Sequence, residues 1–513
     1  MGAHNLVRRL SIGVFVLVVL GAAGLLAAIW MTREPAPSPL TGQRIFAASR
    51  PAVPLVQADF DVKSSVPEPT IPKAKQNQIT NQLIRMVVAS QVADNQAAID
   101  AAAVNILIGN PDAYYEPGSK RWTDEFQLVS TGSGFFVNQD GYIVTAAHVV
   151  SPKKDDIRAE VLQLAQQPDA VSQVEQDLKQ AAQRDLGVSL SDDQAQQLTA
   201  WIGKWNEKYV TIDSVAPTYH IGFGTVVAGD NLATTGVTAT LVAQEPVPPG
   251  RDVAILKADS GTVPALPLAA GNPDQGTQTF VIGYPHSDSL AQASPDSPTM
   301  TATMTSGKTV DTKLMDGWTA YGTAASVTYG NSGGPVLDAE GRVLGIMSFV
   351  PTNSQGQIEA GQGGYFVPVG VIREELQKAS VKPAAGSLTS TYYQALSKGD
   401  IHRYREELPL LTTLQNGSVN EVYVKDDILA AQSAILSGKD KTSPKLTPYL
   451  PEAGAAAGVA LLFMIVALVW PRRRPAAAQI APVEPIAPAQ ATALAGEPTL
   501  VASVPDGSDR GFR

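Results

Sequence analysis

Residues 130–148 read Ser-Thr-Gly-Ser-Gly-Phe-Phe-Val, then Asn-Gln-Asp-Gly, then Tyr-Ile-Val-Thr-Ala-Ala-His. Two runs rich in Val, Ile, Phe and Thr flank a Gln-Asp-Gly turn, which is the pattern of two antiparallel strands with a tight connection. The second run ends at Thr145, and a histidine follows three residues later, at position 148. The stretch therefore predicts a β fold that delivers an imidazole just past a strand end.

The same β signal extends over residues 126–371, where short apolar runs are bounded by Gly, Asp, Asn and Pro. Many short strands at this spacing are typical of a sandwich or a barrel. The predicted strands include residues 133–137, 142–145, 236–242, 253–256, 279–282 and 343–349.

Residues 153–208 interrupt the β pattern with helical periodicity. Ser191 and Gln194 fit a capping box at the start of one of its helices. The segment is predicted to be a helical insertion, and a lid, a docking arm, a spacer and a solvated decoration all remain open as its role. Its two apolar stripes are Val171, Val174 and Leu178, then Leu198, Trp201, Ile202 and Trp205.

The remaining segments outside the β region differ in composition. Residues 32–75 are rich in Pro, Ala and Ser and are predicted to form an extended linker. Residues 76–120 read as a helical lead-in, and residues 381–450 as a helical hairpin region with a break at Gly399-Asp400. The Pro/Ala-rich tail, residues 471–513, is predicted to be disordered.

Two long apolar runs, residues 10–31 and 453–470, predict transmembrane helices. Three arginines at positions 472–474 follow the second run, and positive charge beside a span marks the cytoplasmic side. The expectation is a multi-pass protein of the cell membrane with two spans, cytoplasmic termini (residues 1–9 and 471–513) and everything between them outside. A cleaved signal peptide for the first run and a buried soluble helix for the second are the alternatives.

The composition excludes several classes of function. The chain has 513 residues with 48 acidic and 38 basic side chains, and this net charge of −10 argues against nucleic-acid binding. It has no cysteine, which excludes disulfides, thiol nucleophiles and Cys-ligated metals. The five histidines form no ligand set and no nucleotide-binding motif occurs, so neither a metal nor a cofactor is predicted.

Two further stretches complete a chemical constellation with His148. Asp252 enters an apolar strand, and Ser332 sits in the glycine-rich turn Tyr-Gly-Asn-Ser-Gly-Gly-Pro-Val, residues 329–336. A serine hydroxyl needs a base to become a nucleophile, and imidazole needs a carboxylate to hold its tautomer. We assign the base to His148, the orienting carboxylate to Asp252 and the nucleophile to Ser332. The amides of Gly330 and Ser332 are the candidate donors of an oxyanion hole. Taken singly, each of these residues could also have a purely structural role, such as a buried histidine, a strand cap or a tight turn.

The stretches TAAHVV, DVAILK and GNSGGPV closely resemble the His, Asp and Ser signatures of the chymotrypsin-fold serine proteases, and within them the HtrA/Deg-type branch. Val281-Ile-Gly-Tyr-Pro285 and Gly364-Tyr-Phe-Val-Pro368 are similar to two further strands of that family. The resemblance covers residues 126–375. It implies a mainly β chain with a double β-barrel, trypsin-like serine protease domain at residues 121–380.

By the same resemblance, Ser326 and Tyr365 belong to the primary specificity pocket. A neutral serine at the base of that pocket predicts cleavage after small or medium apolar residues. The chain departs from the family in its long insertion and in having no PDZ-like module after the protease domain. The helical region at 381–450, loosely similar to a tetratricopeptide unit, stands there instead, so peptide-sensing regulation is not carried over.

The leading hypothesis is a membrane-anchored serine endopeptidase that hydrolyses extracytoplasmic proteins through an acyl-enzyme, with a role in envelope protein quality control. Its predicted partners are protein or peptide substrates, with a second copy of the chain or a protein bound by the helical region as further candidates. Two alternatives stay open. One is a latent or inactive protease fold that acts as a chaperone or scaffold, and the other is a two-span adaptor.

Overall fold

The computed structural model describes residues 40–227, 232–285, 299–350, 363–417 and 422–442, with a few positions between 13 and 28 and residues 458–459 and 501–502. The chain divides into two compact units, which are described separately. The larger unit comprises Gly42–Thr389 with Ser418–Tyr423 and Pro488–Arg513. The smaller unit contains Ser390–Gly417 and Val424–Ala487 together with Met1–Thr41.

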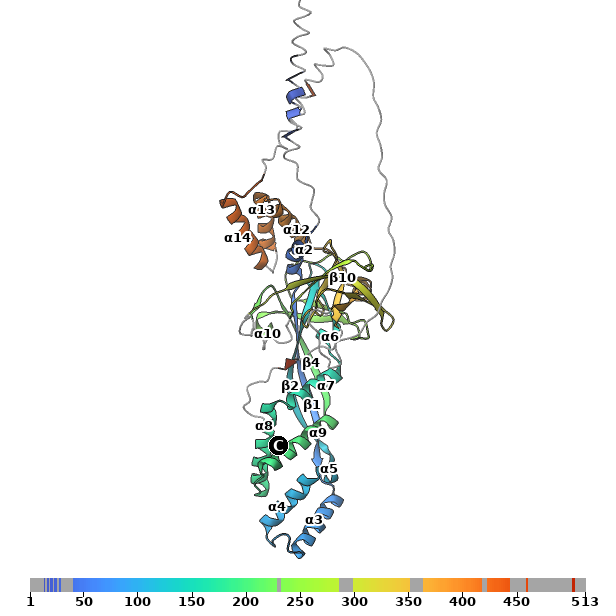
Figure 1. Ribbon diagram of the computed structural model, residues 1–513, viewed down its shortest axis with the longest axis vertical. Helices are drawn as coiled ribbons and strands as arrows, with labels where there is room; N and C mark the ends of the chain where they lie inside the picture. Colours follow the sequence, from blue (N-terminus) through green and yellow to red (C-terminus); the bar gives the residue numbers. More distant parts are fainter. Residues whose placement is uncertain are drawn as a thin grey trace, which may run out of the picture. The chain divides into compact units, whose positions relative to one another are not determined.

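The first half of the larger unit is a closed barrel of six strands (Figure 1). Its strands follow the order β1-β4-β6-β7-β3-β2, and pairing of β1 with β2 closes the ring. Alternate residues of each strand point inward, so Val56, Phe60 and Ile143 are buried in one core. The strands are β1 (Leu55–Thr70), β2 (Glu116–Phe136), β3 (Tyr142–Thr145), β4 (Thr211–Gly222), β6 (Val237–Gln244) and β7 (Ala254–Ala258).

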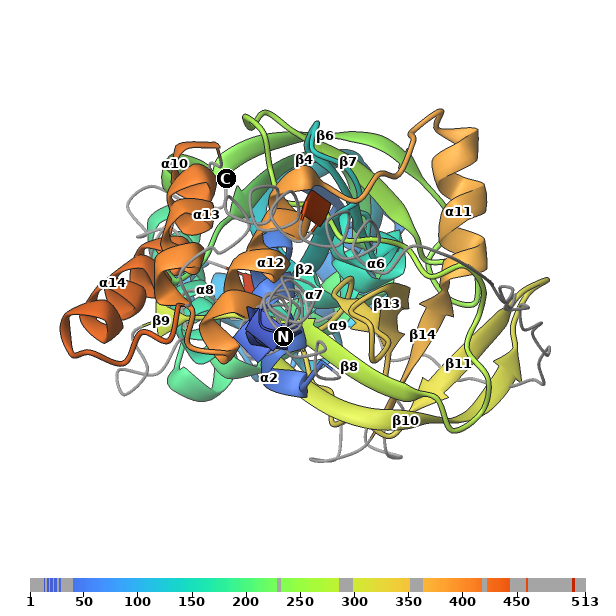
Figure 2. The same cartoon turned by 90° about the horizontal axis from the view of Figure 1, so that it is seen from above.

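The second half is another closed barrel of six strands, in the order β10-β11-β14-β13-β12-β8 (Figure 2). Val281, Val336 and Phe366 lie in its core. Two closed barrels confirm the predicted double β-barrel of the trypsin-like fold. The strands are β8 (Gln278–Gly283), β10 (Thr303–Leu314), β11 (Thr319–Thr323), β12 (Pro335–Leu337), β13 (Val343–Phe349) and β14 (Gly364–Pro368). The short elements are β5 (Val226–Val227), β9 (Thr299–Met300), β15 (Val501–Ala502) and α10 (Leu232–Thr235).

The predicted extended linker at residues 32–75 is wrong for most of its length. The structure forms helix α2 (Gly42–Ser49), a 3₁₀ turn (Arg50–Ala52) and the long strand β1 there. The apolar residues Val56, Ala58, Phe60 and Val62 occupy every second position and are all buried. Their burial stabilises a strand despite the prolines around it. The domain also begins well before the predicted residue 121, because β1 is part of the first barrel.

The β1–β2 ladder runs from the pair Leu55 and Ser133, in the barrel, to the pair Thr70 and Glu116, and its far part extends beyond the barrel as an arm. Helices of the lead-in and of the insertion are attached to this arm (Figure 1). The Trp205 indole donates to Pro67 O (3.0 Å) on β1, and Trp201 donates to Asp112 (2.9 Å) in the lead-in. The helices are α3 (Lys73–Val88), α4 (Gln96–Gly109), α5 (Pro111–Tyr114), α7 (Lys154–Ala165), α8 (Pro168–Leu186) and α9 (Asp192–Tyr209). These elements confirm the predicted helical insertion, and the capping box of Ser191 and Gln194 is present.

Glu160 on α7 carries a pH dependence of stability, because burial raises its pKa from 4.5 to about 7. Between these two values the unfolded chain has lost a proton that the folded chain keeps, so the free energy of unfolding falls as the pH rises. After allowance for its partial exposure, we expect a loss of about 1–3 kcal/mol between pH 5 and pH 8. Urea unfolding of wild type and Glu160→Gln at both pH values measures it. Between pH 5 and pH 8, the free energy of unfolding of the glutamine variant should fall by about 1–3 kcal/mol less than that of the wild type. Equal decreases in the two proteins would contradict the assignment.

In the described part of residues 381–450, which were predicted as a helical hairpin region, the structure forms three helices: α12 (Ser387–Asp400), α13 (Tyr404–Gly417) and α14 (Val422–Leu436). The first break follows Asp400, where His402 adopts a left-handed φ of 59°. Within α13, Pro409 occupies an interior position of the helix.

The predicted spans at residues 10–31 and 453–470 lie mostly outside the described residues, as do residues 1–9 and nearly all of the tail at 471–513. Among the described residues, no helix combines the length and the apolar character needed to cross a bilayer.

Candidate active site

His148 lies in a one-turn helix, α6 (Ala147–Val150), that begins directly after β3. It is 4% exposed, and its backbone N–H donates to Asp252 Oδ1 at 2.9 Å. The ring atom Nδ1 lies 2.8 Å from Asp252 Oδ2. A carboxylate accepts hydrogen bonds, so this contact places the ring proton on Nδ1 and leaves Nε2 as the basic nitrogen. One carboxylate thus orients both the backbone and the ring of the histidine.

Asp252 is fully buried and is held in a left-handed conformation with φ of 51°. A residue other than glycine in this region is uncommon, and such conformations persist where the surroundings impose them. Here the backbone N–H of Asp252 donates to Pro246 O (2.9 Å), and its carbonyl accepts from the Ala147 N–H (3.2 Å). The strained backbone is therefore hydrogen-bonded on both sides, and one of these bonds leads directly into the helix of His148.

Ser348, near the end of β13, is a third donor to the Asp252 carboxylate, through its hydroxyl and Oδ2. Sequence reasoning missed this residue. The available signal is that Ser348 is a buried hydroxyl in the otherwise apolar strand Val343–Phe349, and a buried hydroxyl needs a partner. Ser348 belongs to the second barrel, so its hydrogen bond joins the two barrels at the aspartate.

Ser332 lies in the turn between β11 and β12, and glycines bring this turn against the first barrel. Gly333 has φ of 81°, and a Cβ on it would lie 2.2 Å from Ser133 O and 2.3 Å from Thr145 Oγ1. A Cβ on Gly132 would lie 2.9 Å from Ser332 O and 2.7 Å from Val149, the neighbour of His148. Only glycine allows these approaches. The backbone of Ser332 therefore lies beside the strand end that carries His148.

Of the five consecutive backbone amides of residues 330–334, some donate a hydrogen bond and some do not. Among the described residues, the N–H groups of Gly330 and Ser332 donate no hydrogen bond. These are the two amides predicted to form the oxyanion hole, and unpaired N–H groups flanking a nucleophile suit that task. The other three amides donate to backbone carbonyls: Asn331 to Thr328 (3.2 Å), Gly333 to Met347 (2.7 Å) and Gly334 to Asn331 (2.9 Å).

One contact of the proposed triad is absent: within the described residues, the Ser332 hydroxyl makes no hydrogen bond to His148. In enzymes without substrate this bond is often long and tightens when substrate binds.

The two predicted pocket residues lie on separate elements. Ser326 is exposed in the loop between β11 and β12. Tyr365 is half-buried on β14, where its ring stacks on Phe349 at 5.4 Å and its hydroxyl donates to Asp311 at 2.9 Å. Burial, followed by this hydrogen bond, raises the pKa of Tyr365 to about 12. Asp311 was missed by sequence reasoning. It places a carboxylate beside one predicted pocket residue, while the assignment of the pocket itself stays a prediction.

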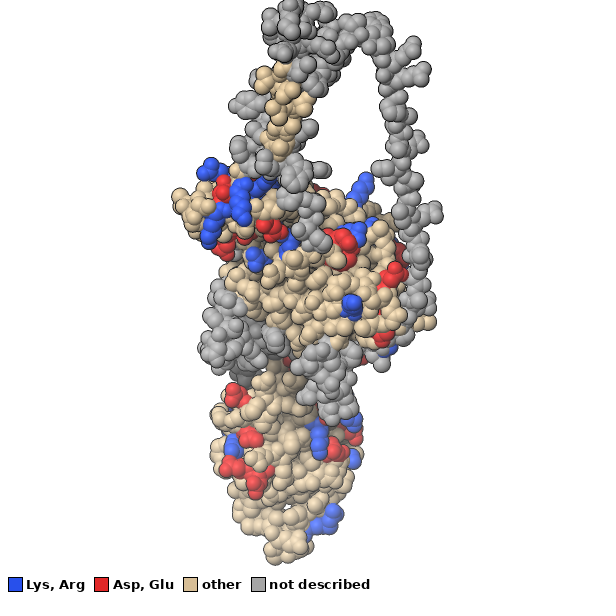
Figure 3. Space-filling model, turned by 45° about the horizontal axis from the view of Figure 1, so that its top comes forward, with Lys and Arg blue, Asp and Glu red and all other residues tan. Residues whose placement is uncertain are grey.

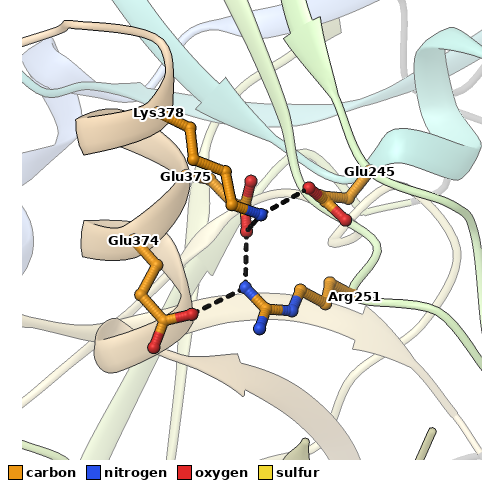
Figure 4. A network of polar contacts seen from close by, with 5 residues as sticks. All are labelled: Glu245, Arg251, Glu374, Glu375 and Lys378. Carbon is orange, nitrogen blue, oxygen red and sulfur yellow. Dashed lines mark hydrogen bonds and ion pairs between the residues drawn. The ribbon is translucent and has the colours of Figure 1, made fainter. Parts of the chain in front are cut away.

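An ion-pair network ties the loop of Asp252 to helix α11 (Val369–Lys378) (Figure 4). Arg251 donates to Glu374 (2.7 Å) and to the buried Glu375 (2.6 Å), and Lys378 bonds both Glu375 (2.8 Å) and Glu245 (2.9 Å). The hydrogen bond to Glu375 is the main reason that the pKa of Arg251 is raised. The network fixes the residue next to the aspartate.

A cavity of about 570 Å³ adjoins this network. Arg251, Trp318, Tyr321 and Glu374 are among the residues that line it. The lining includes none of the three proposed catalytic residues, so the cavity is separate from the proposed centre of reaction.

Comparison with known proteins gives one family match and several structural likenesses. No curated protein matches the sequence. Among solved structures, the HtrA-type protease AlgW with a decapeptide is 16% identical with a TM-score of 0.31, covering 66% of this chain and 68% of that one. The serine endoprotease from Yersinia pestis is 14% identical with a TM-score of 0.30, covering 67% of each. The inactive form of the Rv3671c protease from M. tuberculosis is 19% identical with a TM-score of 0.27, covering 49% of this chain and 85% of that one.

These scores are low, and it is the strand pairings that establish the fold. The family match spans residues 206–346, which begin within the last turn of α9 and contain Asp252 and Ser332 but not His148. That segment of the chain matches the family described as a trypsin-like peptidase domain.

Proposed function

We propose that the protein is a serine endopeptidase that uses Ser332, His148 and Asp252. The observation that carries the proposal is the buried 2.8 Å contact between His148 Nδ1 and Asp252 Oδ2, formed beside the Ser332 turn. A buried histidine oriented by a carboxylate leaves its second nitrogen free to act as a base, which is the requirement for activating a serine. The trypsin-like peptidase match over residues 206–346 supports the same reaction class.

In the proposed mechanism, Ser332 Oγ attacks the carbonyl carbon of the substrate peptide while His148 Nε2 takes the hydroxyl proton. Asp252 holds the ring and stabilises the imidazolium that forms. The carbonyl oxygen becomes an oxyanion, which the free N–H groups of Gly330 and Ser332 bind. His148 then gives its proton to the leaving amine, and water hydrolyses the acyl-enzyme by the same steps in reverse. None of these steps requires a metal or a cofactor.

The proposal extends to location and substrates. The apolar runs at 10–31 and 453–470 support membrane anchoring through two spans, with both termini cytoplasmic and the barrels outside. Protein or peptide substrates of the cell envelope follow from this placement. On the face drawn in Figure 3, acidic and basic side chains of the described residues are intermixed, which does not favour nucleic acid as a partner. Self-association and a protein partner for the helices of 381–450 remain proposals.

The test is covalent labelling of the purified full-length chain, kept in detergent, with a fluorophosphonate probe. One adduct on the wild type and none on Ser332→Ala would support the proposal. Labelling at another residue, or equal labelling of both proteins, would contradict it.

A latent protease fold that acts as a chaperone or scaffold is the second candidate. The missing hydrogen bond between the Ser332 hydroxyl and His148 fits this candidate as well as it fits an enzyme without substrate. A folded wild type that takes no label but prevents aggregation of an unfolded protein would favour this candidate over the enzyme.

For specificity, we expect cleavage after small or medium apolar residues, because a neutral serine offers no partner to a charged side chain. A panel of fluorogenic peptides that differ only at the residue before the scissile bond measures this preference. Peptides with Ala or Val should give the highest kcat/KM. A preference for Arg or Lys would overturn the assignment of Ser326 and point to Asp311 beside Tyr365 instead.

A further inference from the structure

Ser133, on β2, hydrogen-bonds to the turn of the proposed nucleophile at two points. Its backbone N–H donates to Ser332 O at 2.8 Å, and its hydroxyl donates to Gly330 O at 2.7 Å. The residue is fully buried, where an unmade hydrogen bond is costly. One residue of the first barrel therefore binds the carbonyls at both ends of the three-residue segment that carries the free amides.

The direction of the Ser133 hydroxyl is set by a third group. The backbone N–H of Tyr284 lies 2.9 Å from Ser133 Oγ and can only donate to it. The single hydroxyl proton is therefore left for the Gly330 carbonyl. The approach depends on Gly283, since a Cβ there would lie 2.8 Å from Ser133 Oγ and 2.7 Å from Asn331 Oδ1.

Gly330 needs such a contact because glycine does not hold a conformation by itself. Its φ of 86° is allowed, but glycine adopts positive and negative φ with similar ease. The Gly330 carbonyl shares a peptide plane with the Asn331 N–H, which donates to Thr328 O at 3.2 Å. With Ser133 on the oxygen side and Thr328 on the hydrogen side, this plane is fixed. Without the Ser133 hydroxyl, only the longer of the two contacts remains.

We propose that Ser133 is a positioning residue that keeps the oxyanion site open by holding the Gly330 carbonyl. The inference rests on the proposed endopeptidase function and deepens it. Within the described residues Ser133 makes no hydrogen bond to Ser332 Oγ, and it acts through Gly330 and the backbone of Ser332. Its loss therefore affects the binding of a charged tetrahedral oxygen more than the binding of the peptide itself.

The test compares Ser133→Ala, Ser133→Thr and a control, Thr279→Val, in the full-length protein. Thr279 is a fully buried hydroxyl on β8 that bonds Thr323 at 2.7 Å, away from residues 330–332. The measurements are kcat and KM for a peptide, the Tm, and two binding affinities. One affinity is that of a peptidyl trifluoromethyl ketone, which forms a tetrahedral oxyanion on the serine. The other is that of the cleaved peptide product.

For Ser133→Ala, kcat and the affinity of the trifluoromethyl ketone should both fall by about 10-fold to 100-fold, because a misplaced donor costs up to about 100-fold and its complete loss about 100-fold to 1,000-fold. KM and product affinity should stay within about twofold, since ground-state binding does not use the oxyanion hole. Ser133→Thr retains the hydroxyl and should recover most of kcat. If the threonine variant fails to fold, Ser133→Cys replaces it as the test. Because a thiol is a weaker donor than a hydroxyl, its kcat should lie between those of the wild type and Ser133→Ala. Thr279→Val should have a lower Tm than the wild type but an unchanged kcat.

A Ser133→Ala variant that loses Tm like the control while keeping kcat and inhibitor affinity would overturn the inference and leave Ser133 a structural residue. That result is distinct from failure of the proposed function. In the latter case the wild type itself takes no fluorophosphonate and cleaves no peptide.

Discussion

Ser332→Ala is expected to lower kcat/KM for peptide cleavage by about 10⁴–10⁶, the range observed when a triad serine is removed. The reason is that Ser332 carries the one hydroxyl of the turn at 330–334, and this turn lies beside the end of the strand that precedes His148. The measurement is initial rate against a fluorogenic peptide, together with fluorophosphonate labelling. KM should change little, because the hydroxyl contributes to the reaction rather than to peptide binding.

The matched control for that substitution is Ser306→Ala, which removes an exposed serine from β10 of the same barrel. It should leave both rate and labelling at wild-type values. A Ser332→Ala protein that keeps more than about one hundredth of the wild-type rate would exclude Ser332 as the nucleophile.

Asp252→Asn is expected to lower kcat by about 10⁴ at neutral pH while the fold persists, since the two side chains are nearly isosteric. The carboxylate accepts from the His148 backbone, His148 Nδ1 and Ser348. An amide has only one accepting oxygen, and its NH₂ group would face a donor. The favourable response is for the ring to place its proton on Nε2, which then cannot accept the proton of Ser332.

The pH profile of kcat for Asp252→Asn, compared with Asp259→Asn, measures this effect. Asp259 is an exposed carboxylate just after β7, so its loss removes the same charge without touching His148. A fall in kcat of less than about tenfold for Asp252→Asn would show that the aspartate is not needed to orient the imidazole.

Local patterns predicted the strand that ends just before His148 and the strand that begins just after Asp252, because alternation and turn residues act within a few positions. The bounds of β3 and β13 match the prediction. The strand β1 was missed because its four alternating apolar residues lie among prolines that suggested a tether. Composition averaged over a long window hides a strand that tertiary pairing stabilises.

Ser348 and Ser133 were missed for a different reason. Ser348 lies 96 positions from Asp252, and Ser133 lies 197 positions from Gly330. A single serine produces no periodic pattern in the sequence that would mark it. Its role depends on which strand ends come together when the two barrels form. The nucleophile motif marks where the reaction occurs, whereas the residues that hold the motif in place are set by long-range packing.

The position of β1 also has a consequence for how the chain folds. Leu55 pairs with Ser133 on β2 and with Gly222 on β4, so both neighbours of this strand lie far from it in the sequence. Closing such loops costs entropy before any contact repays it, and folds with distant pairings form slowly. During synthesis the first barrel cannot close until β7, which ends at Ala258, has left the ribosome. The hydrogen bonds within the helices between these strands are short-range, so helical turns can begin to form before β1 pairs with β4.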